Sequence, residues 1–183
     1  MTTQRPLLIA YHSDFGRFFS FAKQSKLGEV AESLGLDWVF PQGGWFRAWR
    51  DKDVRGEPSF ELADFDMLTR DREVVLAGYS DGAGLANYLA SYRSHKVIAV
   101  ISYAGRLQRD SIETTRKYPV FDLWNEFDKK EHSQQHRDME SVYDRALHEV
   151  FGKVLPNKKT HYHGWDSDVN DQVIDFIETA MAA

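Results

Sequence analysis

Short apolar runs alternate along the chain with segments whose apolar residues recur at helical spacing. The apolar runs predict buried strands at residues 7–11, 38–40, 74–77, 97–103 and 120–124, and the pattern allows a last strand at 153–161. Helices are predicted at residues 18–34, 60–69, 85–90, 134–151 and 169–181. This alternation predicts an α/β fold, a three-layer α/β/α sandwich around a mainly parallel sheet of about six strands. Because the sequence has no repeat, low-complexity tract or linker, we expect residues 1–183 to form a single domain.

Composition and charge narrow the class of protein. Hydrophobic residues make up 42% of the chain and aromatic residues 14%, which is typical of a globular protein and argues against disorder. The formal net charge of −5 and the scattered basic residues argue against nucleic acid or a membrane surface as partner. The absence of cysteine removes disulfides, thiolate metal ligands and a cysteine nucleophile together. The first apolar run is too short for a signal sequence or a membrane span, so we expect a cytoplasmic protein.

The segment that carries most chemistry is Val74–Gly84, which reads VVLAGYSDGAG. Its apolar run leads into a G-x-S-x-G pattern centred on Ser80, and a predicted helix follows directly. Strand, pentapeptide and helix in this order predict a nucleophile elbow, a turn so sharp that the serine hydroxyl stands above the sheet edge. The spacing of the glycines argues against a phosphate-binding loop and a dinucleotide fingerprint. Ser80 is therefore the candidate nucleophile.

A serine nucleophile needs a base, and the chain has seven histidines to supply it. His12, His161 and His163 lie where strands are predicted to end. His163 lies between the last predicted strand and the last helix, a position from which it can reach back to Ser80. The other four are expected on the surface or on helix faces: His95, His132, His136 and His148. His163 is therefore the candidate base.

The base in turn needs an acid that orients it. Asp128 lies a few residues past the predicted strand at 120–124, in a turn at the same sheet edge as Ser80. Glu126 is its main rival, because the predicted strand end can shift by a couple of residues. Asp122 lies inside the strand, where a buried carboxylate without a partner is costly. Asp128 is therefore the candidate acid.

The order Ser80, Asp128, His163 is that of the α/β-hydrolases, and the chain resembles a compact member of that superfamily from Leu7 onward. It is most similar to small esterases related to polyhydroxybutyrate depolymerases and feruloyl esterases. The matching segments are LLIAYHSDFG, WVFPQGG, GYSDGAG, PVFDLWNEFD and HYHGWD. This resemblance implies a compact α/β-hydrolase fold, and since no insertion is long enough for a cap domain, an exposed and shallow site.

The elbow places the N–H of Asp81 at a helix N-terminus, where it can bind a developing oxyanion. The related esterases commonly have His-Gly after the first strand, where a backbone N–H completes the oxyanion hole. Here the pair is His12-Ser13, so the second donor is expected to be the N–H of Ser13 or of Asp14. Aromatic residues expected to line the substrate site are Phe15, Trp45, Trp165 and, in the same loop as Trp45, Trp49.

Together these residues predict a serine hydrolase of carboxylic esters, acting on small-molecule or polymer esters through an acyl-enzyme. The same triad can serve a thioesterase, an amidase or a peptidase, because the fold does not choose among them. A non-catalytic relative that binds a ligand, and a flavodoxin-like phosphate binder, are the alternatives from other classes. A zinc site at His161, His163, Asp166 and Asp168 is a weaker alternative. We expect no metal and no cofactor, and the sequence leaves the oligomeric state open.

Overall fold

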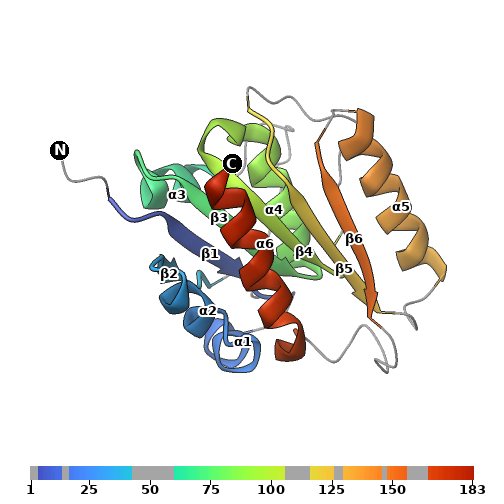
Figure 1. The fold of residues 1–183 in the computed structure, drawn as a ribbon, viewed down its shortest axis with the longest axis horizontal. Helices are drawn as coiled ribbons and strands as arrows, with labels where there is room; N and C mark the ends of the chain where they lie inside the picture. Colours follow the sequence, from blue (N-terminus) through green and yellow to red (C-terminus); the bar gives the residue numbers. More distant parts are fainter. Residues whose placement is uncertain are drawn as a thin grey trace.

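The computed structural model describes residues 4–13, 17–42, 60–105, 116–125, 130–145, 148–155 and 165–183. Six strands, all parallel to their neighbours, form one sheet in the order β2-β1-β3-β4-β5-β6 (Figure 1). The strands are β1 (Leu7–Tyr11), β2 (Asp37–Val39), β3 (Val74–Tyr79), β4 (Val97–Tyr103), β5 (Val120–Asn125) and β6 (Val150–Leu155). Because all strands run the same way, their carboxyl ends meet at one edge of the sheet.

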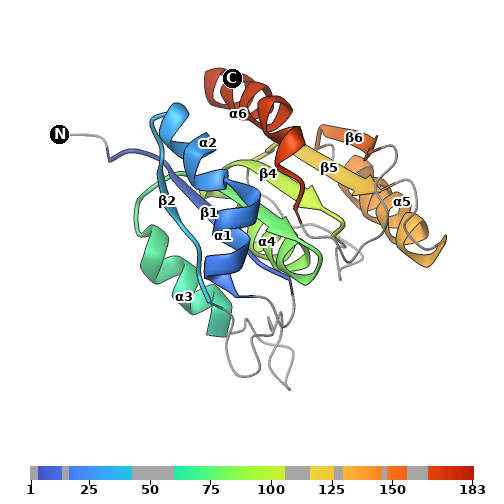
Figure 2. The same ribbon diagram turned by 90° about the horizontal axis from the view of Figure 1, so that it is seen from below.

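Helices cover both faces of the sheet (Figure 2). One face carries α1 (Phe18–Ser25), α2 (Leu27–Ser33) and α6 (Asn170–Ala182), and the other carries α3 (Phe60–Thr69), α4 (Asp81–Tyr92) and α5 (Lys130–Arg145). Within the described residues, the short 3₁₀ helices η2 (Ser94–Lys96) and η4 (Ser167–Val169) precede β4 and α6. The predicted three-layer α/β/α sandwich is confirmed.

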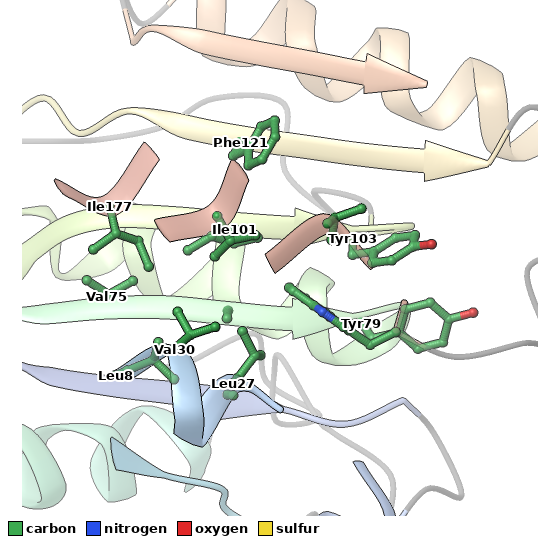
Figure 3. Close-up of a cluster of buried hydrophobic side chains, with 14 of the residues drawn as sticks. Leu8, Leu27, Val30, Val75, Tyr79, Ile101, Tyr103, Phe121 and Ile177 are labelled. Atoms are coloured by element: carbon green, nitrogen blue, oxygen red, sulfur yellow. The ribbon is translucent and has the colours of Figure 1, made fainter. Parts of the chain in front are cut away.

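The period of two along a strand divides its side chains between two cores. Along β1, Leu8 packs in the cluster beneath α1, α2 and α6, whereas Ile9 packs beneath α3, α4 and α5. Figure 3 shows the first cluster, in which Val75 and Ile101 of neighbouring strands lie near Ile177 of α6. Burial on both faces explains why the strands appear in the sequence as unbroken apolar runs.

The predicted helix at residues 18–34 is two helices. Lys26 separates α1 from α2 and adopts a left-handed conformation with φ 54°. Its backbone N–H donates to the carbonyl of Ala22, so Lys26 ends one helix and begins the next. Because of this break, Phe21 and Leu27 both pack in the same core. One continuous helix would direct the two side chains to different faces.

The predicted helix at residues 134–151 is also wrong at its end. Helix α5 runs from Lys130 to Arg145, and Val150 already belongs to β6, where it pairs with Val120 of β5. The last strand, Val150–Leu155, therefore begins three residues earlier than predicted, and residues 156–161 of the predicted strand lie outside the described residues. The apolar residues around Val150 fit the periodicity of a helix and that of a strand. Pairing with β5 makes this segment a strand.

His148 corrects the expectation of a surface or helix-face histidine. It precedes β6, is only 4% exposed, and its Nδ1 lies 2.9 Å from the carbonyl oxygen of Tyr118. Its ring also lies against the Tyr118 ring, with centroids 4.3 Å apart. Burial disfavours the charged imidazolium and lowers the pKa of His148.

Within the ranges described above, no helix combines the length and apolar character needed to cross a membrane.

Candidate active site

Ser80 occupies a strained turn between β3 and α4. Tyr79 ends the strand, Asp81 begins the helix, and Ser80 between them has φ 55° and ψ −121°. These angles are those of the first central residue of a type II′ turn, which glycine normally occupies. A non-glycine residue held there costs about 1–3 kcal/mol, so the surrounding structure must enforce it.

Hydrogen bonds on both sides enforce this conformation. The N–H of Ser80 donates to the carbonyl of Tyr103 on β4 at 2.9 Å. Its carbonyl accepts from the N–H groups of Ala83 and Gly84, each at 3.0 Å, in the first turn of α4. The backbone of Ser80 is thus tied to the neighbouring strand and to the following helix. The side chain remains half-buried at the carboxyl edge of the sheet.

The glycines on either side of Ser80 permit close approach of the backbone. A Cβ on Gly78 would collide with the backbone of Gly82 and Ala83, and a Cβ on Gly82 would collide with the carbonyls of Tyr11 and His12. The first turn of α4 therefore packs directly on the carboxyl end of β1. The spacing of the glycines in G-x-S-x-G follows from these two contacts.

We expect Gly82→Ala to lower the free energy of unfolding by about 3 kcal/mol, because the methyl group meets backbone that cannot rotate away. Gly35→Ala is the matched control: Gly35 has φ +68° but open space around its Cβ position. That change should cost only about 1 kcal/mol, from the left-handed backbone alone. Urea unfolding of both variants measures the difference, and equal losses would contradict the close packing of α4 on β1.

The proposed oxyanion donors lie on the two segments that this packing brings together. Asp81 is the first residue of α4. Tyr11 pairs with Gly78 in the parallel register of β1 and β3, so two residues further on Ser13 follows the strand at the level of Ser80. The carbonyl of Ser13 accepts a hydrogen bond from Nδ1 of His12 at 2.6 Å. Asp14, the other candidate for the second donor, lies outside the described residues.

The ends of β4 and β5 are bound to each other next to the elbow. The hydroxyl of Tyr103 donates to Oδ1 of Asn125 at 3.1 Å, and its ring packs edge-on against Tyr79 with centroids 5.3 Å apart. All three side chains are buried, and Figure 3 shows both tyrosine rings at the same end of the sheet. Asn125 is the last residue of β5, three positions before Asp128.

Trp165, which we expected to line the substrate site, packs in the hydrophobic core. It is 1% exposed, and its ring packs against Tyr103 and Phe21 with centroids 5.4 Å and 6.2 Å away. Its Nε1 donates to Oδ1 of Asn170 at the start of α6. Trp165 therefore anchors the chain that enters α6 onto the sheet edge where Ser80 lies.

Asp122 lies within β5, as predicted, and is fully buried. It pairs with Ser102 of β4 and Gly152 of β6, three residues before the carboxyl end of the strand. Its carboxylate is close enough to Tyr143 of α5 to contribute to the raised pKa of that phenol, although burial is the main cause. This position is in the layer between sheet and α5, away from the strand end that carries the elbow.

Several predicted site residues lie outside the described residues, and their placement stays a prediction. They are Asp128 and His163 of the proposed triad, the rivals Glu126 and His161, and the aromatic residues Phe15, Trp45 and Trp49. The zinc alternative is untested for the same reason. Within the described ranges, no group of three histidines, aspartates or glutamates is arranged to hold a metal ion.

Sequence reasoning missed one pair of polar side chains at this edge. His12 is 1% exposed, and its Nε2 lies 3.1 Å from the amide nitrogen of Gln42, which follows β2. His12 directly precedes Ser13 and was recognised as a strand-end histidine, but its partner was not. Gln42 carries no such signal, because a glutamine before two glycines resembles any loop residue.

The same arrangement of sheet and helices occurs in other solved structures, among them a carboxylesterase. SOBER1 of Arabidopsis thaliana superposes with a TM-score of 0.75 at 12% identity, covering 97% of this chain and 100% of that one. The Bacillus cereus carboxylesterase gives 0.70 at 15% identity, covering 97% and 90% of the two chains. Est1E from Butyrivibrio proteoclasticus gives 0.68 at 13% identity, covering 98% and 90%.

The chain has the α/β-hydrolase fold. At these identities the likeness establishes the fold alone. No protein-family model matches the chain, and no curated protein matches it in sequence. Within this α/β-hydrolase fold, Ser80 stands at the turn from β3 into α4, where the sequence predicted the elbow.

Proposed function

We propose that this protein is a serine hydrolase that cleaves carboxylic esters. The observation that carries the proposal is the backbone of Ser80, with φ 55° at the junction of a buried parallel strand and a helix. Ser80 adopts a backbone conformation that glycine normally occupies, at a cost in stability. Such a cost is expected where the serine hydroxyl must project from the sheet edge to react. The esterase names that several structural neighbours carry agree with this choice of reaction.

In the proposed mechanism Ser80 Oγ attacks the ester carbonyl while His163 takes its proton. Asp128 accepts a hydrogen bond from the other ring nitrogen and keeps the imidazole in the useful tautomer. The N–H of Asp81 and a second N–H from Ser13 or Asp14 bind the tetrahedral oxyanion. The alcohol leaves with the proton from His163, and water, activated by the same histidine, releases the acid from the acyl-enzyme.

Two buried side chains support this assignment of the triad. Asn125 and Trp165 are both fixed to Tyr103, whose carbonyl accepts the N–H of Ser80. Asp128 is three residues from Asn125, and His163 is two residues from Trp165. Since an extended chain spans at most about 3.6 Å per residue, both groups start within reach of the elbow.

A fluorophosphonate label tests the proposed class of protein. An active serine hydrolase should be modified once, at Ser80, as determined by mass spectrometry of the intact protein and its peptides. A non-catalytic binding protein of the same fold would remain unmodified, and modification at another serine would contradict the role of Ser80.

For the substrate we expect a preference for esters of short acyl chains. Each methylene gains about 0.8 kcal/mol only where protein walls bury it, and no cap domain is predicted that could supply them. The value of kcat/KM for p-nitrophenyl esters should therefore level off or fall beyond roughly four to six acyl carbons. Activity that keeps rising towards long fatty acyl chains would contradict a shallow site. Matched thioesters and anilides in the same assay distinguish esterase from thioesterase and amidase.

A further inference from the structure

Strand β6 ends the sheet, and in the part of the chain that the structure describes it pairs on one side only, with β5 (Figure 1). Helix α5 packs on one face of β6, and on the other face Phe176 of α6 contacts Phe151, with ring centroids 5.7 Å apart. Phe151 is nevertheless 49% exposed, and Val154 is 46% exposed. An edge strand with exposed apolar side chains is a template for pairing with another chain.

The opposite edge of the sheet is protected in a way that β6 is not. Strand β2 has only three residues, and its Asp37 forms an ion pair with Arg72. Short length and charge both prevent an edge strand from pairing with another chain. Lys153 is the charged residue of β6, but its ammonium group donates to Gln172 of α6 and is held over the face of the sheet. The edge that is open to a further strand is therefore that of β6.

The backbone groups that β6 presents at this edge follow from its pairing with β5. The carbonyl of Glu149 faces β5, where it accepts the N–H of Val120 at 2.8 Å. Successive residues of a strand direct their backbone groups to alternate sides, so the N–H and C=O of Val150, Gly152 and Val154 point away from β5. Gly152 and Val154 are also exposed. A further strand would bind to these groups.

A second copy of β6 can bind them by antiparallel pairing about a twofold axis. With the axis at Gly152, Val150 of each copy pairs with Val154 of the other, and all the outward groups are used. An axis one residue earlier would need the N–H of His148, which already donates to a carbonyl of α5 at 3.1 Å. An axis one residue later would need an N–H on Pro156, which proline lacks. The strand is thus complementary to itself about Gly152.

Charges on α5 are arranged about the same point. A Cβ on Gly152 would lie 2.5 Å from Oε1 of Glu140, so the middle of α5 lies over this residue. Arg137 and Asp144 are exposed and lie one turn before and one turn after Glu140 on the same side of the helix. A twofold axis at Gly152 makes α5 antiparallel to its copy, and Arg137 of each then faces Asp144 of the other. This reciprocal charge complementarity favours a second copy over an unrelated strand.

We propose that two copies of this chain associate through β6 into one continuous sheet, paired antiparallel about Gly152, with the two α5 helices side by side. The two Glu140 carboxylates approach each other in this dimer, and Arg137, one turn away, offsets their repulsion. Because the strands of the two copies run in opposite directions, the carboxyl edges that carry Ser80 face opposite ways. The inference does not depend on the proposed function.

Charge reversal tests the twofold pairing of the helices. Sedimentation velocity over a wide range of protein concentration at low salt should show a reversible dimer of the wild type. Asp144→Arg should weaken this dimer by roughly 10-fold, because the twofold axis repeats the new repulsion. Combining it with Arg137→Asp should restore the dimer. Asp138→Arg is the matched control, because Asp138 is exposed on another side of α5 and should leave the dimer unchanged.

A second variant tests the pairing of the strands. Val154→Pro removes an N–H that points away from β5, so the monomer should fold, as proline is tolerated on the open side of an edge strand. We expect the dimer to weaken by roughly 10–100-fold, since each lost hydrogen bond occurs twice. Amide hydrogen exchange at Gly152 should slow as the wild-type concentration rises, and Val154→Pro should lose this dependence.

A wild type that sediments as a monomer at every concentration would overturn the proposal. So would a dimer that Asp144→Arg leaves unchanged, or one in which exchange at Gly152 does not depend on concentration. Failure of the combined charge reversal to restore the dimer would overturn the pairing of Arg137 with Asp144. If Val154→Pro does not fold, the charge variants and hydrogen exchange of the wild type still decide. Ester hydrolysis is measured separately, so the proposed function can fail or hold independently of the dimer.

Discussion

Ser80→Ala is expected to lower kcat for ester hydrolysis by roughly 10⁵–10⁶-fold, the scale seen when a serine hydrolase loses its nucleophile. The oxyanion donors alone cannot form an acyl-enzyme, so the remaining rate should show no burst. The fold should be unaffected, because the bonds that hold the elbow come from the backbone of Ser80, at its N–H and its carbonyl. Initial rates and a burst titration with a p-nitrophenyl ester measure the effect.

Ser141→Ala is the matched control for this change. Ser141 lies on the exposed side of α5, where its hydroxyl accepts a hydrogen bond from Arg145. The control should keep full activity and fluorophosphonate labelling, whereas Ser80→Ala should lose both. A Ser80→Ala protein that retains a hundredth or more of the wild-type rate would require a different nucleophile.

Asp128→Asn should cost roughly 10⁴-fold in kcat, because an amide donates where the carboxylate accepts and so selects the wrong imidazole tautomer. Glu126→Gln, two residues earlier, should leave kcat within a few-fold of the wild type. Asp122→Asn should act on stability rather than on kcat, since Asp122 is fully buried within β5. Rates at saturating substrate and urea unfolding of the three variants separate these effects.

The opposite pattern of losses would reassign the acid. Full activity in Asp128→Asn together with a large loss in Glu126→Gln would move the role to Glu126. A loss of kcat in Asp122→Asn without a loss of stability would move it into the strand.

Much of the fold could be predicted because its strands are buried on both faces. The runs at 7–11, 97–103 and 120–124 coincide with β1, β4 and most of β5, and the elbow follows from local spacing of glycines and a serine. These features depend on residues that are neighbours in the sequence. Local patterns therefore determine them.

The errors occur where a distant partner decides. Leu27 packs in a core to which α6 contributes, and Val150 becomes a strand residue because β5 offers it a pairing edge. Trp165 is buried by Tyr103, a residue 62 positions earlier in the chain, so no local pattern separates a core tryptophan from one that binds substrate.

The same dependence on distant partners explains why the contact between His12 and Gln42 was missed. Gln42 is held by His12, 30 residues away, and by the first N–H of α1. Polar contacts between loops leave no periodic signal in a sequence, unlike the burial of strands and helices.

The hydrogen bond from Ser80 to Tyr103 has a consequence for the order of folding. The elbow also requires β1 beneath α4, and β1 joins β3 across 67 positions, from Leu7 to Val74. Pairings this far apart in sequence form slowly, because the intervening chain must first lose much of its freedom. A growing chain therefore holds an ordinary, unreactive serine until residues 7 to 103 have assembled. The proposed nucleophile therefore forms together with the central sheet, and a fragment that ends before β4 does not carry it.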